Sequence, residues 1–265
     1  MGAPIGSNEA QNPLIRAIVR SVSLANRGRY RLYYVPGYRC FMYLNLSERL
    51  TLRRLVGQYE RAKMGLFRRC VKQGMVVVDV GANLGDFTLV AAKATGPEGK
   101  VVAIEPDPQN IGWLTKSVER NGFKNVEIRQ EALSASEALA PLFLSDVSGW
   151  HTLNVGQVPM SAERPPITVQ TRPLDTLTLD RLDVVKIDVE GAEYDVLCGA
   201  KQHLQRFHPL LFVDLHASMG ANVDGVLQNL HGLGYRLRGI GNDGRMHDRI
   251  DPDGELVAVP PNRHV

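Results

Sequence analysis

The stretch "VVVDVGANLG", residues 76–85, decides the fold. Three β-branched residues begin a buried strand, which carries Asp79 near its end and runs into a turn between Gly81 and Gly85. A glycine turn between a strand and the following helix offers backbone N–H groups to a ligand at the positive helix N-terminus. The stretch therefore predicts the first strand of a parallel sheet, with a ligand bound beside the turn.

Apolar strands and amphipathic helices alternate from residue 75 onward. Strands are expected at 75–80, 100–106, 126–133, 182–189, 209–216, 235–240 and 254–260. Helices are expected at 83–95, 108–122, 191–207 and 223–234. This order predicts an α/β fold with a doubly wound, mostly parallel sheet that helices cover on both faces. The stretch 138–171 has no regular pattern and is expected to form a long irregular loop over the site.

The N-terminal region has a different composition. After a tail at 1–13, a helix is expected at 14–25, a β-hairpin around Pro36-Gly37, and a helical stretch at 48–74 with a break near Gly57. We expect an extension at 1–57 and a main domain at 58–265. Between Arg16 and Lys72, 14 basic residues stand against two acidic ones, although the net charge of the chain is only +3. Such a face can bind an anionic partner, but a solvated face that pairs with the acidic body is the favoured interpretation.

Cysteine usage and hydropathy bear on the cellular location. Cys40, Cys70 and Cys198 are odd in number and widely spaced, so they indicate neither a disulfide framework nor a zinc pattern. The sequence has no run of 18 apolar residues, and its N-terminus lacks the pattern of a secretory signal. We therefore expect a cytoplasmic protein without a membrane span.

The residues around the turn suggest its ligand. Glu105 ends the second strand 20 residues after Gly85, where a carboxylate can accept hydrogen bonds from ribose hydroxyls. The turn lacks the middle glycine of the dinucleotide fingerprint and the Gly-Lys-Ser/Thr ending of a phosphate loop. Asp79 would repel a pyrophosphate but suits an ammonium or sulfonium group. S-adenosylmethionine, which has both groups and a ribose, is the expected cofactor, and an NAD-type oxidoreductase on a similar sheet is the alternative.

Two longer segments carry a family resemblance. "VVVDVGANLGDFTLVAAKATGPEGKVVAIEPDP" (76–108) and "KIDVEGAEYDVLCGA" (186–200) resemble the FkbM-type S-adenosylmethionine-dependent methyltransferases. These have a D-V-G-A-N-x-G turn, an E-P strand end and a K-I-D-V-E-G-A-E segment, and the match covers roughly 59–260. The resemblance implies a Rossmann-like, seven-stranded class I methyltransferase sheet with an antiparallel last strand, and mostly O-methylation.

The same resemblance implies a set of cofactor-binding residues. The family pattern assigns Asp79, Gly81, Asn83 and Gly85 to the methionine end and ribose, Glu105 to the ribose hydroxyls, Pro106 or Asp107 to the adenosine, and Glu131 and Ala132 to the adenine. Tyr59-Glu60 resembles the Y-E element that precedes the sheet in this family. Glu60 is thus expected at the cofactor's amino group, or else in a salt bridge of its basic helix.

Methyl transfer to a hydroxyl needs an aligned acceptor and a way to remove its proton. Because neighbouring strands end in "KIDVEG" and "FVDLH", Asp188, Glu190, Asp214 and His216 are expected to converge near the methyl group. His216 could be the general base, with Asp188 as a further catalytic residue. Alternatively, Asp188, Asp214 and His216 could bind Mg²⁺, which lowers the pKa of the substrate hydroxyl. The two aspartates could also be simple helix caps, and His216 a core histidine.

The irregular loop offers a second histidine. If a metal holds His216, the base must come from elsewhere, and His151 is the candidate. The family commonly has a small-residue S-G segment at this place, so Trp150-His151 departs from it. Trp150 and Glu190 are expected to contact the substrate.

These residues together predict an S-adenosylmethionine-dependent O-methyltransferase. The expected acceptor is a hydroxyl of a sugar, an oligosaccharide or a polyketide-like small molecule, methylated by direct displacement. The N-terminal helix and hairpin are expected to cover the site or to form a homodimer contact. RNA methylation is an alternative because of the basic N-terminal region, but no nucleic-acid-binding module is recognisable, so nucleic acid is not the expected partner.

Overall fold

The computed structural model describes residues 28–48, 50–145, 151–153, 164–261 and 263. The predicted helix at 14–25 therefore lies outside the described residues. The chain divides into two compact units, with the boundary between Tyr59 and Glu60. Each unit is described by itself.

The N-terminal unit contains the hairpin expected around Pro36-Gly37. Strands β1 (Tyr30–Val35) and β2 (Cys40–Asn45) pair antiparallel, with Tyr30 opposite Asn45 and Val35 opposite Cys40. Side chains at alternate positions of β2 are buried, as the period of a half-buried strand requires. The short helix α2 (Thr51–Leu55) follows, and the turn after it contains Gly57, where the break was predicted.

The second unit is built on a large mixed sheet. Among the described residues its eight strands are β3 (Val76–Val80), β4 (Lys100–Ile104), β5 (Val126–Arg129), β9 (Val184–Ile187), β10 (Leu210–Asp214), β11 (Arg236–Ile240), β12 (Met246–His247) and β13 (Glu255–Val259). Their order is β12-β11-β13-β10-β9-β3-β4-β5. The neighbouring strands β5, β4, β3, β9 and β10 are parallel to one another. Strand β13 lies between β10 and β11 and is antiparallel to both. This confirms the doubly wound, mostly parallel sheet. Seven of these strands form the predicted set, and the two-residue β12 adds an eighth.

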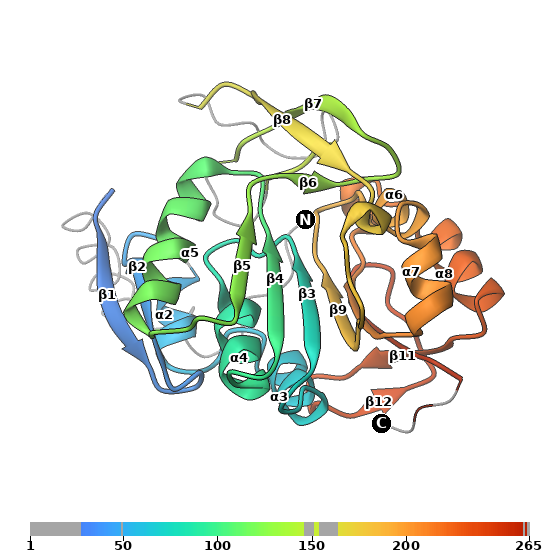
Figure 1. The fold of residues 1–265 in the computed structure, drawn as a ribbon, viewed down its shortest axis with the longest axis horizontal. Helices are drawn as coiled ribbons and strands as arrows, with labels where there is room; N and C mark the ends of the chain where they lie inside the picture. The colour runs from blue at the N-terminus through green and yellow to red at the C-terminus, as the bar shows by residue number, and fades with distance from the viewer. Residues whose placement is uncertain (1–27, 49, 146–150, 154–163, 262, 264–265) are drawn as a thin grey trace, which may run out of the picture. The chain divides into compact units, whose positions relative to one another are not determined.

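Helices lie along this sheet as the alternation predicted (Figure 1). They are α3 (Arg61–Cys70), α4 (Asp86–Thr95), α5 (Pro108–Arg120), α6 (Glu193–Cys198), α7 (Lys201–Phe207) and α8 (Val223–Gly232), with short 3₁₀ turns at Leu174–Thr176 and Ala217–Met219. The helix expected at 191–207 is split into α6 and α7 at Gly199, where a Cβ would overlap the carbonyl oxygen of Ser134. Close packing there bends the chain, so the prediction of one continuous helix was wrong.

A second, smaller sheet corrects two expectations. Its strands are β6 (Ala132–Leu133), β7 (Ala138–Leu142) and β8 (Ile167–Arg172), in the order β6-β8-β7. The predicted strand 126–133 thus splits between two sheets, and the stretch 138–171 is not irregular throughout. Leu142 and Val169 bury a small apolar cluster that stabilises the extra pairing. Figure 1 shows the small sheet beyond the ends of β4 and β5.

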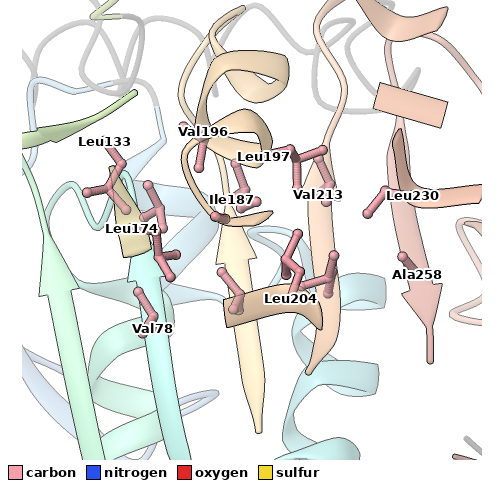
Figure 2. Close-up of a cluster of buried hydrophobic side chains, with 14 of the residues drawn as sticks. Val78, Leu133, Leu174, Ile187, Val196, Leu197, Leu204, Val213, Leu230 and Ala258 are labelled. Atoms are coloured by element: carbon pink, nitrogen blue, oxygen red, sulfur yellow. The ribbon is translucent and has the colours of Figure 1, made fainter. Parts of the chain in front are cut away.

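The core of the second unit covers both faces of the large sheet. Leu211 and Val213 of β10 pack in one cluster with side chains of α6, α7 and α8. Figure 2 labels in this cluster Val78, Leu133, Leu174, Ile187, Val196, Leu197, Leu204, Val213, Leu230 and Ala258. Phe212 points to the opposite face, where its ring lies 5.3 Å from that of Phe67 in α3. Strand periodicity therefore assigns every second strand residue to the α3 and α4 side.

No helix within the described part of the chain is long and apolar enough to cross a membrane.

Candidate active site

The glycine turn after β3 is pressed against the end of β9. Gly81 has a φ of +76°, and a Cβ there would overlap the carbonyl oxygen of Asp188, so only glycine fits this position. The backbone N–H groups of Gly81 and Ala82 donate to the carbonyl oxygen of Ile104 at 2.9 Å. Gly85 has a φ of +98°, which residues with a side chain rarely adopt, and a Cβ there would also displace the end of the Leu114 side chain. The turn predicted from the sequence is therefore fixed by close backbone packing.

Asp79 lies buried beneath this turn. Its Oδ2 accepts a hydrogen bond of 2.6 Å from the hydroxyl of Thr88, at the start of α4. Burial raises the pKa of Asp79, and the nearby Lys186 ammonium opposes that shift. Its Oδ1 accepts no hydrogen bond from any described residue. A buried carboxylate oxygen with spare acceptor capacity is the kind of group that a bound cation can satisfy.

Glu105 connects the turn to the start of α5. Its carboxylate accepts hydrogen bonds from the backbone N–H of Asn83 at 2.8 Å and of Asp107 at 3.0 Å, and from the side-chain amide of Asn110 at 3.3 Å. The side chain is buried, and this burial raises the pKa of Glu105. The structure thus brings Asn83 and Glu105 together, and their binding of a ribose stays a prediction.

Asp107 is the N-cap of α5, and it also holds the loop that precedes β8. Its Oδ1 accepts from the backbone N–H of Gln109, while Oδ2 lies 2.8 Å from the Arg164 guanidinium and 3.1 Å from Nε2 of His151. Burial acts to raise the pKa of Asp107, but the hydrogen bonds from His151, Arg164 and Gln109 lower it to about 2. Asp107 is therefore an ionised anchor for two loop residues.

His151 lies between Ser145 and Asp107. Its Nδ1 accepts from the backbone N–H of Ser145 at 3.1 Å, and its Nε2 faces Asp107. Both ring nitrogens thus have partners, and the role of His151 as a general base stays a prediction. The neighbouring Thr152 donates its hydroxyl to the carbonyl oxygen of Glu190 at 2.8 Å. Trp150 lies outside the described residues.

The two residues predicted at the adenine lie where β5 leads into the small sheet. Glu131 is buried, and its carboxylate lies 2.7 Å from Nε of Arg129 and 3.4 Å from Nε of Arg172. Ala132 begins β6 and contributes to the small apolar cluster. Both residues have local structural partners, and their role at a cofactor stays a prediction.

Asp188, Glu190 and His216 converge beyond the ends of β9 and β10. One ligand atom from each lies within 4.8 Å of the others. Nε2 of His216 is 3.4 Å from Oε2 of Glu190 and 3.8 Å from Oδ1 of Asp188, while its Nδ1 is 2.7 Å from Oε1 of Glu193. We call Asp188, Glu190 and His216 the acceptor cluster.

Charges within the acceptor cluster shift its protonation. Burial raises the pKa of Glu190 to about 8, and the Asp188 carboxylate adds to this effect. Burial acts to lower the pKa of His216, but the hydrogen bond to Glu193 and the surrounding carboxylates raise it to about 10. His216 therefore carries a proton at neutral pH unless another cation takes the place of that proton.

Asp214 and Glu60 belong to a different ion-pair group. Nζ of Lys63, in α3, lies 2.5 Å from Oδ2 of Asp214 and 2.8 Å from Oε2 of Glu60. Burial alone would lower the pKa of Lys63, but these two carboxylates raise it well above its ordinary value. Asp214 was therefore wrongly predicted to join Asp188 and His216 as a metal ligand. Glu60 forms the salt bridge that the sequence offered as its second interpretation.

Lys186 joins the glycine turn to the acceptor cluster. Its Nζ lies 3.0 Å from Oδ2 of Asp188, 3.4 Å from the carbonyl oxygen of Gly81 and 3.9 Å from Oδ1 of Asp79. Burial acts to lower the pKa of Lys186, but the Asp188 and Asp79 carboxylates outweigh this effect and raise the pKa above its ordinary value. One buried ammonium group thus neutralises charge on both sides of the site.

Sequence comparison agrees with this architecture. A sequence profile of the FkbM methyltransferase domain matches residues 79–237, which is more than half of the chain. The chain belongs to the FkbM methyltransferase family. This confirms the resemblance inferred from the turn and from the "KIDVEGAE" segment.

This FkbM family member is similar to several named proteins. Methyltransferase 1 of Beauveria bassiana is 29% identical over 143 residues, which are 46% of this chain and 57% of that protein. Hexuronic acid methyltransferase AglP of Haloferax volcanii is 26% identical over 190 residues, 70% of this chain and 74% of that protein. The crystal structure of an FkbM methyltransferase from Methylobacillus flagellatus KT has 16% identity and a TM-score of 0.48, over 92% of this chain and 59% of that chain. The chain spans only 57% to 60% of the length of Methyltransferase 1 and of Methyltransferase sdnD from Sordaria araneosa.

Sequence reasoning missed three charged residues of this FkbM family member: Lys63, Lys186 and Glu193. A signal existed for Lys186, because a lysine inside the apolar run "VVKI" must be buried and therefore paired. Glu193 lies within the quoted "VEGAE" segment, yet its partner His216 is 23 residues away in sequence. No local pattern connects Lys63 to Asp214, which lies 151 residues further along the chain.

Proposed function

We propose that this FkbM family member is an S-adenosylmethionine-dependent methyltransferase acting on a hydroxyl of a sugar, an oligosaccharide or a polyketide-like small molecule. The observation that carries the proposal is the junction of the glycine turn with the acceptor cluster. Gly81 packs on the carbonyl oxygen of Asp188, and Lys186 contacts both sides. The hexuronic acid in the name of the relative AglP supports a polyhydroxylated acceptor.

The residues of the turn fit the proposed cofactor. The buried Asp79 has an oxygen without a hydrogen bond from any described residue, and an ammonium or sulfonium group could satisfy it. Glu105 lies against the turn, and its carboxylate has the chemistry to accept hydrogen bonds from ribose hydroxyls. When bound, S-adenosylmethionine supplies a methyl group activated by a sulfonium sulfur.

The acceptor cluster would handle the acceptor hydroxyl. Transfer forms a bond between the acceptor oxygen and the methyl carbon, breaks the bond from that carbon to sulfur, and releases the hydroxyl proton. Asp188 and Glu190 would accept a hydrogen bond from the acceptor hydroxyl and take up its proton, and the positively charged His216 would stabilise the negative charge that develops on the acceptor oxygen. Alignment of the oxygen with the methyl group is the main contribution expected from the protein.

The cofactor is tested by isothermal titration calorimetry with S-adenosylhomocysteine, and with NAD as the control ligand. We expect S-adenosylhomocysteine alone to bind. Glu105→Gln should weaken this binding, whereas Glu98→Gln, at an exposed position, should leave it unchanged. Thermal unfolding of each variant establishes that it is folded. Binding of NAD alone, or of neither ligand by folded protein, would overturn the proposal.

The acceptor class is tested with methyl-labelled S-adenosylmethionine and a panel of hexuronic acids, oligosaccharides and polyketides, with RNA as a separate arm. Label is expected in a hydroxylated small molecule. His216→Ala should lower turnover far more than it lowers the affinity for S-adenosylhomocysteine. Transfer of label to RNA alone would refute the small-molecule acceptor, and unchanged turnover would remove His216 from the chemistry.

The N-terminal unit has a proposed role as well. We propose that it forms a homodimer contact. Its described part is a β-hairpin with a short helix. Sedimentation of the full chain at several concentrations tests the dimer, and a monomer at all concentrations would contradict it.

A further inference from the structure

We propose that Asp188, Glu190 and His216 bind one divalent cation, Mg²⁺ or Mn²⁺, beside the glycine turn. Of the residues first predicted to bind metal, Asp188 and His216 have their ligand atoms grouped with those of Glu190, whereas Asp214 pairs with Lys63 and Glu60 lies on the same lysine. Binding of the cation depends only on the geometry of these side chains. Its part in catalysis rests on the proposed methyl transfer.

The distances between the ligand atoms fit such an ion. Nε2 of His216 lies 3.4 Å from Glu190 and 3.8 Å from Asp188, and all three ligand atoms lie within 4.8 Å of one another. An octahedral Mg²⁺ with bonds of about 2.1 Å separates neighbouring ligand atoms by about 3.0 Å and opposite ones by about 4.2 Å. Small side-chain rotations would bring the three atoms to these separations.

His216 is oriented as metal-bound histidines are. Oε1 of the fully buried Glu193 lies 2.7 Å from Nδ1 and also accepts the backbone N–H of Gly191 at 3.0 Å. With Glu193 as the acceptor, Nδ1 carries a hydrogen, and Nε2 faces the two carboxylates of the cluster. A carboxylate behind a ligating histidine fixes its tautomer and ring orientation in many metal sites. Without a metal ion, the proton on Nε2 supplies the positive charge between the two carboxylates, and a divalent cation would take the place of that proton.

The neighbouring lysines do not supply that charge. Nζ of Lys186 binds Oδ2 of Asp188, which leaves Oδ1 facing His216, and Lys63 pairs with Asp214 and Glu60. Lys186 thus orients Asp188 in the way that Glu193 orients His216. The two carboxylate oxygens suit Mg²⁺ and Mn²⁺, and the imidazole nitrogen favours Mn²⁺ of the two, whereas soft metals favour thiolate ligands.

The place of the cation indicates what it would do. The Asp188 carboxylate contributes a ligand atom to the cation site, and the Asp188 carbonyl oxygen packs against Gly81. The ion would therefore lie next to the glycine turn. Three protein ligands leave positions for acceptor oxygens in a six-coordinate ion. Neighbouring hydroxyls of a sugar could occupy two of these, and coordination would lower the pKa of the reacting hydroxyl. The proton would then leave to water, without a histidine base.

The test is a titration of Mn²⁺ into the full chain saturated with S-adenosylhomocysteine, followed by calorimetry and by the electron paramagnetic resonance signal of free Mn²⁺. One Mn²⁺ should bind per chain. Glu190→Gln should weaken binding by more than about tenfold, and Glu193→Gln by about 10- to 100-fold. Glu98→Gln is the matched control at an exposed position and should keep the affinity of the parent.

Absence of Mn²⁺ binding, or variants at Glu190 and Glu193 that retain full affinity, would overturn the proposal. His216→Gln replaces Glu193→Gln if the latter does not fold. The two proposals fail in different ways. Mn²⁺ binding without S-adenosylhomocysteine binding would remove the proposed function alone, and the reverse result would remove the cation site alone.

Discussion

Replacing Asp107 by asparagine tests the anchor that joins α5 to the loop residues His151 and Arg164. Asparagine keeps the N-cap hydrogen bond to Gln109, because its side-chain oxygen is a good cap acceptor. It loses the negative charge that His151 and Arg164 face. The pKa of this carboxyl falls from the ordinary 3.8 to about 2, in spite of burial. Each factor of ten in proton affinity is worth about 1.4 kcal/mol, so ionised Asp107 contributes about 2 kcal/mol to the free energy of unfolding.

The sign of this contribution fixes its pH dependence. Because the folded pKa lies below the unfolded one, the stabilisation is present above about pH 4 and is lost as the pH falls towards 2. We therefore expect D107N to be about 2 kcal/mol less stable than the parent at pH 7. This difference should shrink between pH 4 and pH 2.

Urea unfolding followed by circular dichroism at a series of pH values measures the difference. Asp180→Asn, at an exposed position, is the matched control and should match the parent at every pH. Equal stability of D107N and the parent at pH 7 would refute the reasoning. So would a loss that stays constant down to pH 3, because it would then have a cause other than charge.

Three further substitutions test the packing around the site. Gly81→Ala should weaken S-adenosylhomocysteine binding by more than about tenfold, because a Cβ cannot fit against the Asp188 carbonyl oxygen and the turn must shift to accommodate it. Calorimetry with an unchanged affinity would contradict this. Lys63→Met leaves Asp214 buried without its partner and should lower the free energy of unfolding in urea by about 3–5 kcal/mol. Adding Asp214→Asn to the same chain should restore part of this loss. Additive losses in the double variant would argue against the ion pair. Leu204→Ala creates a cavity in the core and should cost about 2–5 kcal/mol while leaving S-adenosylhomocysteine affinity unchanged in calorimetry. A loss of affinity in that variant would mean that the core and the site are coupled.

The fold and the glycine turn could be predicted because their signals are local. Apolar runs of five or six residues identify parallel strands, and the spacing from Gly85 to Glu105 follows from one helix and one strand. The two sheets were harder to separate, because a strand that passes from one sheet to another has the same sequence pattern as a continuous strand. Residues 130–131 carry no turn signal, yet β5 ends there and β6 begins in the small sheet.

The site was predicted only as far as the strands extend. Period two places Asp214 on the same face as Phe212, and in the structure it meets Lys63 of α3 on that face. His216 and Glu190 lie beyond the ends of β10 and β9, where the strand period no longer applies.

Glu190 shows why the geometry past a strand end needs the structure. Its φ of +52° is uncommon for a residue with a side chain, and Gly191 follows with a φ of +105°. This left-handed turn allows Glu190 to reach His216, while Glu193 binds the same imidazole from α6. Each strand end could be predicted to bear acidic groups. The conformation of the turn at Glu190 and the start of α6 at Glu193 decide which acidic groups share His216 as a partner. No residue pattern predicts the conformation of that turn.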